Sequence, residues 1–499
     1  MSLSEHLPIL VILLPLLSAP LCILLASPKL AWLVTQAACL LSFILSIILL
    51  QNILAHGPIS YALGGWQPPW GIEYRFDLLS SSLLLLICGM ATLVVCFARH
   101  SVPAEIKQQH IVPFYAALLL AIAGLGGITA SGDVFNLFVF LEVSSIASYT
   151  LISMGRDRRA LNAAFKYLVM GTIGATFILI GIGFLYMQTG TLNMQDLAVL
   201  LPELYDNRTI RAGFAFLTVG ISLKLALFPL HLWLPNAYAF APSAVSVFLA
   251  GTATKVAVYM LLRFLLSVFG IEFSLQDMPL NLILIALGSV AVLSCSLVAI
   301  YQNNCKRLFA YSSVAQIGYI ALAIGLASHA GISAAVLHIF NHALMKGALF
   351  MALGAVLFRL GSVQIDSLQG LIKQMPLTAL ALIIGGLSLV GVPGTAGFIS
   401  KWFLINAIIE QGLWPLTGVV LIGSVLALIY VWKMVEKVLS RKQTDTEIEA
   451  KEQVITEAPL SMLLPLWVLV GANLYFGLNT ELTVDLAQQA SLFLIGGER

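Results

Sequence analysis

An acid and a lysine stand inside long apolar runs, where a charged group is costly. Glu142 lies nine residues after Asp133 in an otherwise apolar run, so a helix rising 1.5 Å per residue would place it near mid-membrane. Lys224 lies in another such run, five residues before Pro229. Because a carboxylate at that depth must be paired or protonated, we expect Glu142 and Lys224 to pair. Opening and closing the pair would change the proton affinity of the lysine; the alternative is a structural pair that fixes helix register.

A row of basic residues on one helix face is the second candidate for proton chemistry. His338, His342 and Lys346 are spaced four residues apart, which aligns them on one side of a helix. Histidine titrates near neutral pH, so such a row suits proton transfer through intervening water. Two alternatives are ordinary packed histidines and a metal site, because His-x-x-x-His presents two ligands together. No cysteine or further acid offers a third ligand, and we predict no metal.

Two further lysines lie in apolar runs. Lys255 has no acid in its own run, and a lysine buried without a fixed partner releases its proton more readily than one in water. That suits a relay station; the alternative is a lysine bound to backbone carbonyls. Lys401 follows Pro393 and would be the last proton carrier; the alternative is a lysine that snorkels to the interface. For Arg263 we expect snorkelling or structural pairing.

The composition excludes a soluble enzyme. Hydrophobic residues make up 60% of the 499 and charged residues only 10%, with a mean hydropathy of +0.98, whereas a soluble domain carries about 25% charged residues. A net charge of +2 predicts no nucleic-acid partner. The six cysteines show no C-x-x-C spacing, and there is no P-loop, dinucleotide or haem motif. We therefore predict no cofactor, and electron transfer by this chain is disfavoured.

The apolar runs predict the architecture. A helix that crosses a bilayer needs about 20 mostly apolar residues. Runs of that order cover residues 7–26, 30–50, 78–97, 112–130, 133–153, 163–187, 211–240, 242–267, 281–302, 308–327, 331–358, 376–409, 414–436 and 459–477. We predict an all-α integral membrane protein with about fourteen transmembrane helices.

The basic residues predict the orientation. With an even number of spans both termini lie on one side, and the segments on that side hold few basic residues, namely Arg75, Arg208, Arg211 and Arg499. Most others, Lys306 among them, fall on the opposite side, which the positive-inside rule makes cytoplasmic. We expect a multi-pass protein of the cell (inner) membrane with both termini outside.

Two of the predicted spans are interrupted by proline, at Pro229 and Pro393. Carbonyls freed by a proline survive in a membrane only where they line protein or a water-filled cavity. Residues 112–267 and 281–436 each contain five spans with the broken one fourth, and an odd number of spans gives two repeats opposite orientations. Paired broken helices in inverted repeats indicate a transport site. The predicted units are 1–111 (helices 1–3), 112–267 (first repeat), 281–436 (second repeat) and 437–499 (cytoplasmic linker and last helix).

These segments resemble the antiporter-like subunit family, which includes the proton-pumping membrane subunits of respiratory complex I, the A-type and D-type subunits of the Mrp sodium/proton antiporter, and related hydrogenase subunits. The resemblance covers roughly residues 70–440. It lies in the residues Phe135–Val143 with Ser148 and Tyr149, Ser222–Ala237, Pro242–Lys255, His338 to Lys346, and Pro393–Lys401. It implies fourteen helices, with inverted repeats of helices 4–8 and 9–13.

The resemblance also implies roles for single residues. Glu142 and Lys224 would be the ion pair of helices 5 and 7, and Lys255 the connecting lysine of helix 8. His338 and the residues after it would be the relay of helix 11, and Lys401 the exit residue of helix 12. A lysine at that last position departs from the glutamate of the M-type subunit of complex I. The sequence around Glu142 most resembles that of the D-type subunit of the Mrp antiporter or of the hydrogenase-linked relatives.

The sequence therefore predicts a proton-translocating subunit of a multi-subunit cation/proton antiporter of the Mrp type, a transporter subunit rather than an enzyme. The alternative is a non-catalytic proton-pumping subunit of a complex I-like or hydrogenase-like redox complex, and a third class is a scaffold that anchors soluble redox partners. The expected partners are other membrane subunits and the lipid bilayer, and the expected substrates are protons, with or without sodium.

Overall fold

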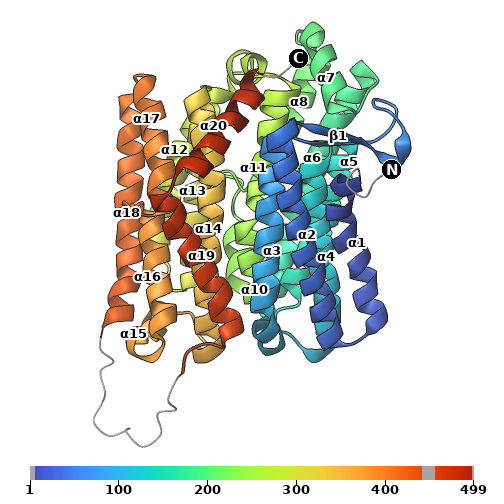
Figure 1. Cartoon of the computed structure of the whole chain (residues 1–499). Coiled ribbons are helices and arrows are strands. Elements are labelled where there is room, and N and C mark those ends of the chain that lie inside the picture. The colour runs from blue at the N-terminus through green and yellow to red at the C-terminus, as the bar shows by residue number, and fades with distance from the viewer. Residues whose placement is uncertain (1–5, 441–455, 497–499) are drawn as a thin grey trace, which may run out of the picture.

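The computed structural model describes residues 6–440 and 456–496, and nearly all of them are helical. Within these ranges twelve helices are long and apolar enough to cross a membrane, and they stand side by side in one bundle (Figure 1). They are α1 (Leu7–Leu25), α2 (Pro28–His56), α3 (Leu78–Glu105), α4 (Ile111–Ala130), α5 (Val134–Ser153), α6 (Arg158–Thr189), the helix Ser243–Val268, α12 (Leu280–Ile300), α13 (Cys305–Gly325), α14 (His329–Leu360), α18 (Trp414–Leu439) and α19 (Leu460–Leu478). The chain is a multi-pass membrane protein, as its composition predicted.

The other two predicted spans are each two shorter helices. Residues 211–240 form α8 (Arg208–Leu225) and α9 (Leu234–Phe240), and residues 376–409 form α16 (Pro376–Val390) and α17 (Ala396–Glu410). The second break contains Gly391 and Gly394 with φ of 92° and 86°, a left-handed backbone that only glycine adopts without strain. The number fourteen is reached only by counting each broken segment as one span, and it stays a prediction.

The segment 242–267 is not the regular helix that we expected. It is α10 (Ser243–Gly251) and α11 (Ala253–Leu262), separated by a kink at Thr252, and it continues as a π-helix, η5 (Arg263–Val268). Polar side chains hold the carbonyls before the kink, since Leu249 accepts from the Tyr238 hydroxyl and Ala250 from the Lys255 ammonium. The kink is thus a tertiary feature that an apolar run does not reveal.

Several elements outside the spans were also not predicted. Strands β1 (Ile59–Ala62) and β2 (Glu73–Phe76) form an antiparallel hairpin with Ile59 opposite Phe76. Helix α20 (Glu481–Gly496) follows α19 and lies obliquely across the upper part of the bundle (Figure 1). The shorter elements are η2 (Leu63–Gly65), η3 (Gln108–His110), α7 (Met194–Leu200), η4 (Leu201–Leu204), η6 (Phe273–Asp277), η7 (Ile365–Leu368) and α15 (Leu371–Gln374).

The centre of the bundle is formed by the segment Ser243–Val268, which carries Lys255, and by α13. In Ser243–Val268 and in α13, 94% of the apolar window is buried within the chain, against 39% in α1, α6 and α18. The outer helices expose large apolar side chains such as Leu24 and Phe165. A side chain on α11, α13 or α14 is therefore enclosed by protein on nearly all sides.

Candidate functional site

The predicted ion pair of Glu142 and Lys224 is present, next to the break between α8 and α9. Lys224 is the next-to-last residue of α8, and its Nζ lies 3.6 Å from Glu142 Oε1. The same Nζ donates to Ser145 Oγ at 2.8 Å and to the Tyr149 hydroxyl at 3.4 Å. The lysine side chain is 4% exposed, whereas the glutamate side chain is 30% exposed. Glu142 is thus less enclosed than we expected, because α5 lies at the surface of the bundle.

A small pocket with hydroxyl groups on one side lies between Lys224 and α11. Its volume is about 30 Å³, which is enough for a water molecule. One side is lined by hydroxyl groups from α5 and α6, and the other by an apolar face of α11. These residues are Ser144, Ser145, Ser148 and Tyr167 on the first side and Ala253 and Val256 on the second. The pocket can hold a water molecule between Lys224 and α11.

Lys255 is 1% exposed and lies just after the kink at Thr252. Its Nζ donates to the carbonyl of Ala250 and, at 3.4 Å, to Thr254 Oγ1. No carboxylate lies within 4 Å of it among the residues that the structure describes. Lys255 is therefore bound to a backbone carbonyl, which is one of the two alternatives that we gave for it. A lysine bound in this way can still act as a proton carrier.

The row on α14 is fully buried. The rings of His338 and His342 are nearly parallel, with centroids 5.9 Å apart. Both ring nitrogens of His342 are buried without a hydrogen-bond partner in the described part of the chain. Lys346 Nζ donates to the Phe309 carbonyl at 2.9 Å and to Ser312 Oγ. Within residues 6–440 and 456–496 no group of three or more His, Cys, Asp or Glu side chains could hold a metal ion.

The charges of the lysines act on these histidines. Lys255 and Lys346 both act electrostatically on His342, and they act together with Lys401 on His338. Because like charges this close in a buried site repel one another, protonation of one group disfavours protonation of the next. The row is therefore not suited to hold several positive charges at once.

Lys401 lies on α17 and reaches back to the end of α16. Its Nζ donates to the carbonyls of Leu389 and Val390 at 3.1 and 2.9 Å and to Ser424 Oγ at 3.1 Å. The residue is 5% exposed, so the snorkelling alternative is wrong. The preceding residue, Ser400, shares a 2.8 Å hydrogen bond with His338 Nδ1. The second break is thereby joined directly to the row on α14.

Two further charge clusters were not recognised in the sequence. Arg263 pairs with Asp77, the N-cap residue of α3, which also accepts from the amide of Ser80. We expected snorkelling or structural pairing for Arg263, and the structure shows the structural ion pair. Burial raises the pKa of the Asp77 carboxyl, but Arg263 and Ser80 outweigh it and hold that pKa below its usual value. In the second cluster Lys306, predicted in a cytoplasmic loop, is only 2% exposed and lies near Glu105.

Replacing Arg263 by Leu should strongly destabilise the protein. The change leaves the Asp77 carboxylate buried without its partner, and breaking a buried pair in this way costs about 3–5 kcal/mol. We expect a clearly lower unfolding temperature in detergent. Arg211→Leu is the matched control, since its pair with Asp206 is exposed and should contribute little. Equal unfolding temperatures for the two variants would contradict a structural role for the buried pair.

Comparisons with known proteins agree with this fold. The sequence family described as "NADH:quinone oxidoreductase/Mrp antiporter, TM" matches residues 131–427. The N subunit of NADH-quinone oxidoreductase from Desulforudis audaxviator is 38% identical over 98% of this chain and 99% of its own. The D subunit of the Na(+)/H(+) antiporter from Alkalihalophilus pseudofirmus is 31% identical over 88% of this chain and 86% of its own. A chain of the Mrp complex from Dietzia sp. DQ12-45-1b has the same fold, with a TM-score of 0.90 at 24% identity, covering 100% of this chain and 98% of that one.

Proposed function

The chain belongs to the NADH:quinone oxidoreductase/Mrp antiporter transmembrane family, and from this premise we propose that it is the proton-translocating subunit of a multi-subunit cation/proton antiporter. One observation carries the proposal. Lysines and histidines are deeply buried in the bundle, since Lys224, Lys255, His338 and Lys401 are each at most 6% exposed, and we propose that they form one row. A scaffold has no need of such groups, because each costs at least about 2.5–3.5 kcal/mol at membrane depth.

The ion pair would control the first transfer. At an effective dielectric constant near 20, two unit charges about 4 Å apart attract by roughly 4 kcal/mol, which changes a proton equilibrium by roughly a thousandfold. Moving Glu142 away from Lys224 therefore favours release of the lysine's proton into the adjoining pocket. The neutral amine of Lys255 takes up the proton, and the return of Glu142 favours recharging of Lys224.

The second half of the row would complete the transfer. The His342 ring faces the His338 ring, His338 shares a hydrogen bond with the hydroxyl of Ser400, and Lys401 follows next along α17. We propose that these groups carry the proton onward from Lys255. Each group accepts a proton on one nitrogen and gives it up to the next, with water filling the intervals. Release from Lys401 resets the row, because an uncharged acceptor again stands at its end.

We also propose the repeats and the units predicted from the sequence. The first repeat, 112–267, contains the broken pair α8 and α9, and the second, 281–436, contains α16 and α17. What supports the correspondence is a lysine at each break. Lys224 stands one residue before Leu225, the last of α8, and Lys401 binds the carbonyls at the end of α16. Residues 1–111 and 437–499 would flank the repeats.

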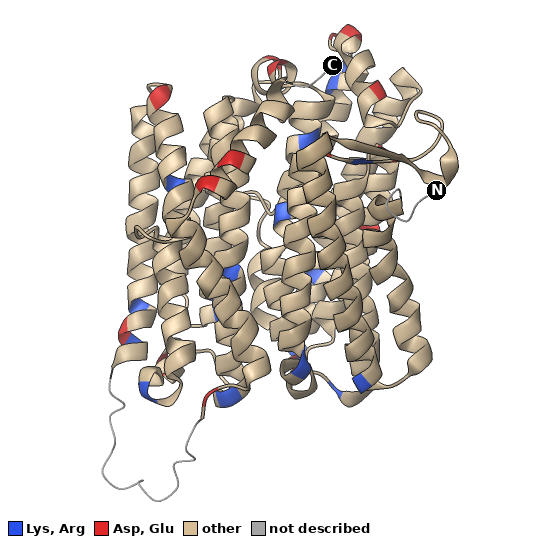
Figure 2. Cartoon of the chain, viewed as in Figure 1, with Lys and Arg blue, Asp and Glu red and all other residues tan. Residues whose placement is uncertain are grey.

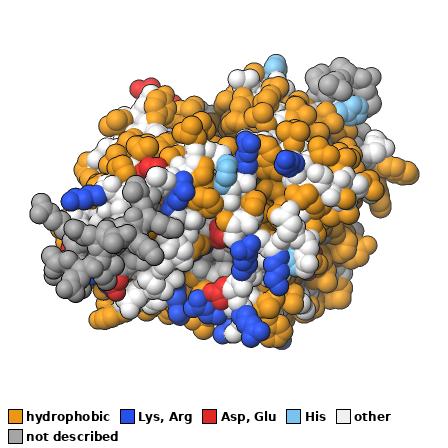
Figure 3. Space-filling view, turned by 90° about the horizontal axis from the view of Figure 1, so that it is seen from below, with side chains coloured by type: hydrophobic (Ala, Val, Ile, Leu, Met, Phe, Trp, Pro, Cys, Tyr) orange, Lys and Arg blue, Asp and Glu red, His pale blue; other side chains and the backbone are white. Residues whose placement is uncertain are grey.

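The charge distribution supports the proposed orientation. Lysines and arginines gather at the lower end of the bundle (Figure 2), and a view from below shows several of them together (Figure 3). The positive-inside rule makes this end cytoplasmic. Helix α1 then begins, and α20 ends, on the outer side of the cell membrane.

Other membrane subunits are the proposed partners. Both curated relatives are named as subunits. Glu142, a carboxylate at membrane depth, is 30% exposed on this chain, and a neighbouring subunit packed on α5 would cover it. Such a neighbour is also well placed to move the glutamate and so drive the first transfer.

The second candidate function is a proton-pumping subunit of a redox complex, and the 38% identity to the N subunit of an NADH-quinone oxidoreductase favours it. Vesicles that contain the chain with its native partners distinguish the two. The antiporter proposal expects added NaCl to dissipate an imposed pH gradient, read from a pH-sensitive dye. Proton uptake that follows quinone reduction and ignores sodium and potassium would support the redox complex and overturn the antiporter.

A further inference from the structure

The second break is held by a side chain from outside the two proposed repeats. The first amides of a helix have no partners within that helix, and at membrane depth they need partners elsewhere. Asn473 Oδ1, on α19, accepts from the amide of Ala396, the first residue of α17, at 3.2 Å. The same oxygen accepts from Ser388 Oγ at 2.7 Å, and Ser388 Oγ accepts from the amide of Gly397 at 3.2 Å. Asn473 therefore caps α17 from a different helix.

Helix α19 also contacts the break through its backbone. Gly477 stands one turn after Asn473 on the same helix. A Cβ at Gly477 would lie 2.4 Å from the carbonyl carbon of Thr395 and 2.6 Å from the carbonyl oxygen of Gly394, so no side chain fits there. Thr395, the N-cap residue of α17, makes no capping bond of its own, and its hydroxyl donates to the Val392 carbonyl instead. Two successive turns of α19 thus hold the start of α17.

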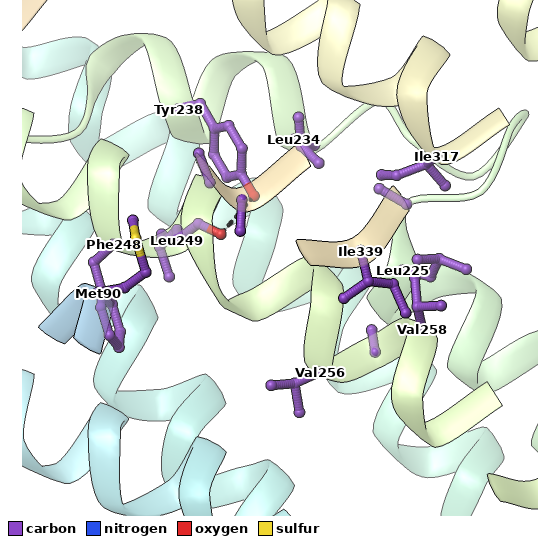
Figure 4. Packing of buried hydrophobic residues seen from close by; sticks show 14 of the residues in the cluster. Met90, Leu225, Leu234, Tyr238, Phe248, Leu249, Val256, Val258, Ile317 and Ile339 are labelled. Atoms are coloured by element: carbon purple, nitrogen blue, oxygen red, sulfur yellow. Dashed lines mark hydrogen bonds between the residues drawn. The ribbon is translucent and has the colours of Figure 1, made fainter. Parts of the chain in front are cut away.

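A second amide side chain binds Ala396 from α14. Asn341 lies between the two histidines of the row, and its Nδ2 donates to the Ala396 carbonyl at 2.7 Å. Two residues earlier, Ile339 belongs to the hydrophobic core together with Leu225 and Val258 (Figure 4), and such side chains offer no hydrogen bond. Both backbone groups of Ala396 are therefore bound by asparagines, one from α19 and one from α14. We call Asn341 and Asn473 the asparagine clasp.

Each amide of the asparagine clasp is only partly used. Asn341 and Asn473 are fully buried, yet Asn341 Oδ1 and Asn473 Nδ2 have no hydrogen-bond partner within residues 6–440 and 456–496. Leaving a buried polar atom unbound is costly. The clasp thus keeps one acceptor and one donor that can form new bonds if the start of α17 shifts.

The asparagine clasp lies close to Lys401 along α17. Lys401 follows Ala396 by five residues, and its Nζ binds the carbonyls at the end of α16. The two sides of the break are therefore joined twice, by Asn473 through Ser388 and by Lys401 itself. Moving Ala396 away from α16 would also withdraw the ammonium of Lys401 from these carbonyls. Because hydrogen bonds to the charged form favour that form, the withdrawal would ease the release of the proton.

We propose that Asn341 and Asn473 are positioning residues for Lys401, and that α19 controls through them how firmly Lys401 binds the end of α16. This inference rests on the proposed function and adds a control element to it. Neither asparagine carries a proton. While the clasp holds Ala396, Lys401 keeps its charge; a movement of α19 that opens the clasp lets Lys401 give up its proton.

The groups that face Lys401 come from four helices. Besides the carbonyls of α16 they are Ser424 Oγ on α18 at 3.1 Å, the Tyr319 ring on α13 with its centroid 5.0 Å from Nζ, and His338 on α14, on which Lys401 acts electrostatically. Of these side chains His338 and Tyr319 titrate, and a substitution of Asn473 removes neither. A change in pH dependence caused by that substitution therefore reports on how Lys401 is held.

The test is the pH dependence of proton transport by Asn473→Leu, which removes the acceptor at similar size. In liposomes that contain the assembled complex, we expect slower transport per complex and an alkaline limit that moves to lower pH by roughly one unit, because the Lys401 ammonium loses its carbonyl partners. Asn473→Asp keeps an oxygen for the Ala396 amide and should not show this shift. A merely structural role predicts fewer assembled complexes with an unchanged pH profile, and that result would overturn the inference.

Asn479→Leu is the matched control. Asn479 is exposed just after α19, where its Nδ2 donates to the Tyr475 hydroxyl, and its change should leave rate and pH profile as in the wild type. Asn341→Leu should shift the profile in the same direction as Asn473→Leu, and it carries the same test if Asn473→Leu does not assemble. Unshifted profiles beside a blocked Glu142→Gln would refute the clasp alone. Wild-type transport by Glu142→Gln as well would refute the proposed function.

Discussion

Replacing Glu142 by Gln is expected to reduce proton-coupled transport at least a hundredfold while the complex still assembles. The amide keeps the size of the side chain but removes the charge that stabilises the Lys224 ammonium, roughly 4 kcal/mol at this separation. No carboxylate then approaches and leaves Lys224, so its proton affinity no longer changes and the first transfer is no longer controlled. The measurement is the initial rate of proton movement in vesicles, normalised to the amount of assembled complex.

The control for this change is Glu410→Gln, at the exposed end of α17. It removes the same charge far from the ion pair and should transport normally. A Glu142→Gln variant that assembles and transports near the wild-type rate would show that the pair only fixes the register of α5 and α8.

Replacing Lys401 by Gln is expected to have a comparably large effect. The amide can still donate to the carbonyls of Leu389 and Val390, so the break between α16 and α17 keeps a hydrogen-bond donor. It cannot carry a proton away from Ser400, so transport should stop although folding is preserved. Lys401→Glu should recover part of the transport, because it restores a titratable group.

Lys433→Gln is the matched control for Lys401→Gln. Lys433 Nζ also donates to main-chain carbonyls, those of Ile300 and Gln302 at 3.0 and 3.3 Å, but it lies outside the row. The two variants should differ at least tenfold in transport rate per complex. Equal losses in both would mean that Lys401 serves only to cap a helix end.

The helical bundle could be predicted because apolar length alone determines which segments cross a membrane. The breaks at Pro229 and Pro393 could be predicted for the same local reason, since proline cannot donate to the carbonyl one turn before it. The kink at Thr252 could not, because it depends on Tyr238 and Lys255 binding the carbonyls of Leu249 and Ala250. No local rule places a tyrosine from α9 beside that turn.

The residues of the candidate site likewise divide into those that the sequence reveals and those that it does not. Glu142, Lys224, Lys255 and Lys401 could be recognised because a charge in an apolar run is conspicuous. Lys306 could not, because it precedes Arg307 at the start of a helix, where a basic pair usually marks a cytoplasmic loop. Its burial depends on Ser243, 63 residues earlier in the chain.

Asp77 was missed for a related reason. It precedes the apolar run of α3 and has the features of an ordinary N-cap, which it also is. It is also the partner of Arg263, which lies 186 residues later in the chain. The spacing of residues along the chain therefore does not reveal which charges at helix ends pair with residues far away in the sequence.

The exchange of Lys255 for Arg tests most directly whether the buried row carries protons. Arginine keeps a positive charge and donors for the Ala250 carbonyl, but it cannot be deprotonated in a protein. Proton flux should be measured in liposomes that contain the purified complex, with Lys433→Arg as the control. The account predicts flux at background for Lys255→Arg and near-normal flux for Lys433→Arg. Wild-type flux through Lys255→Arg would contradict it.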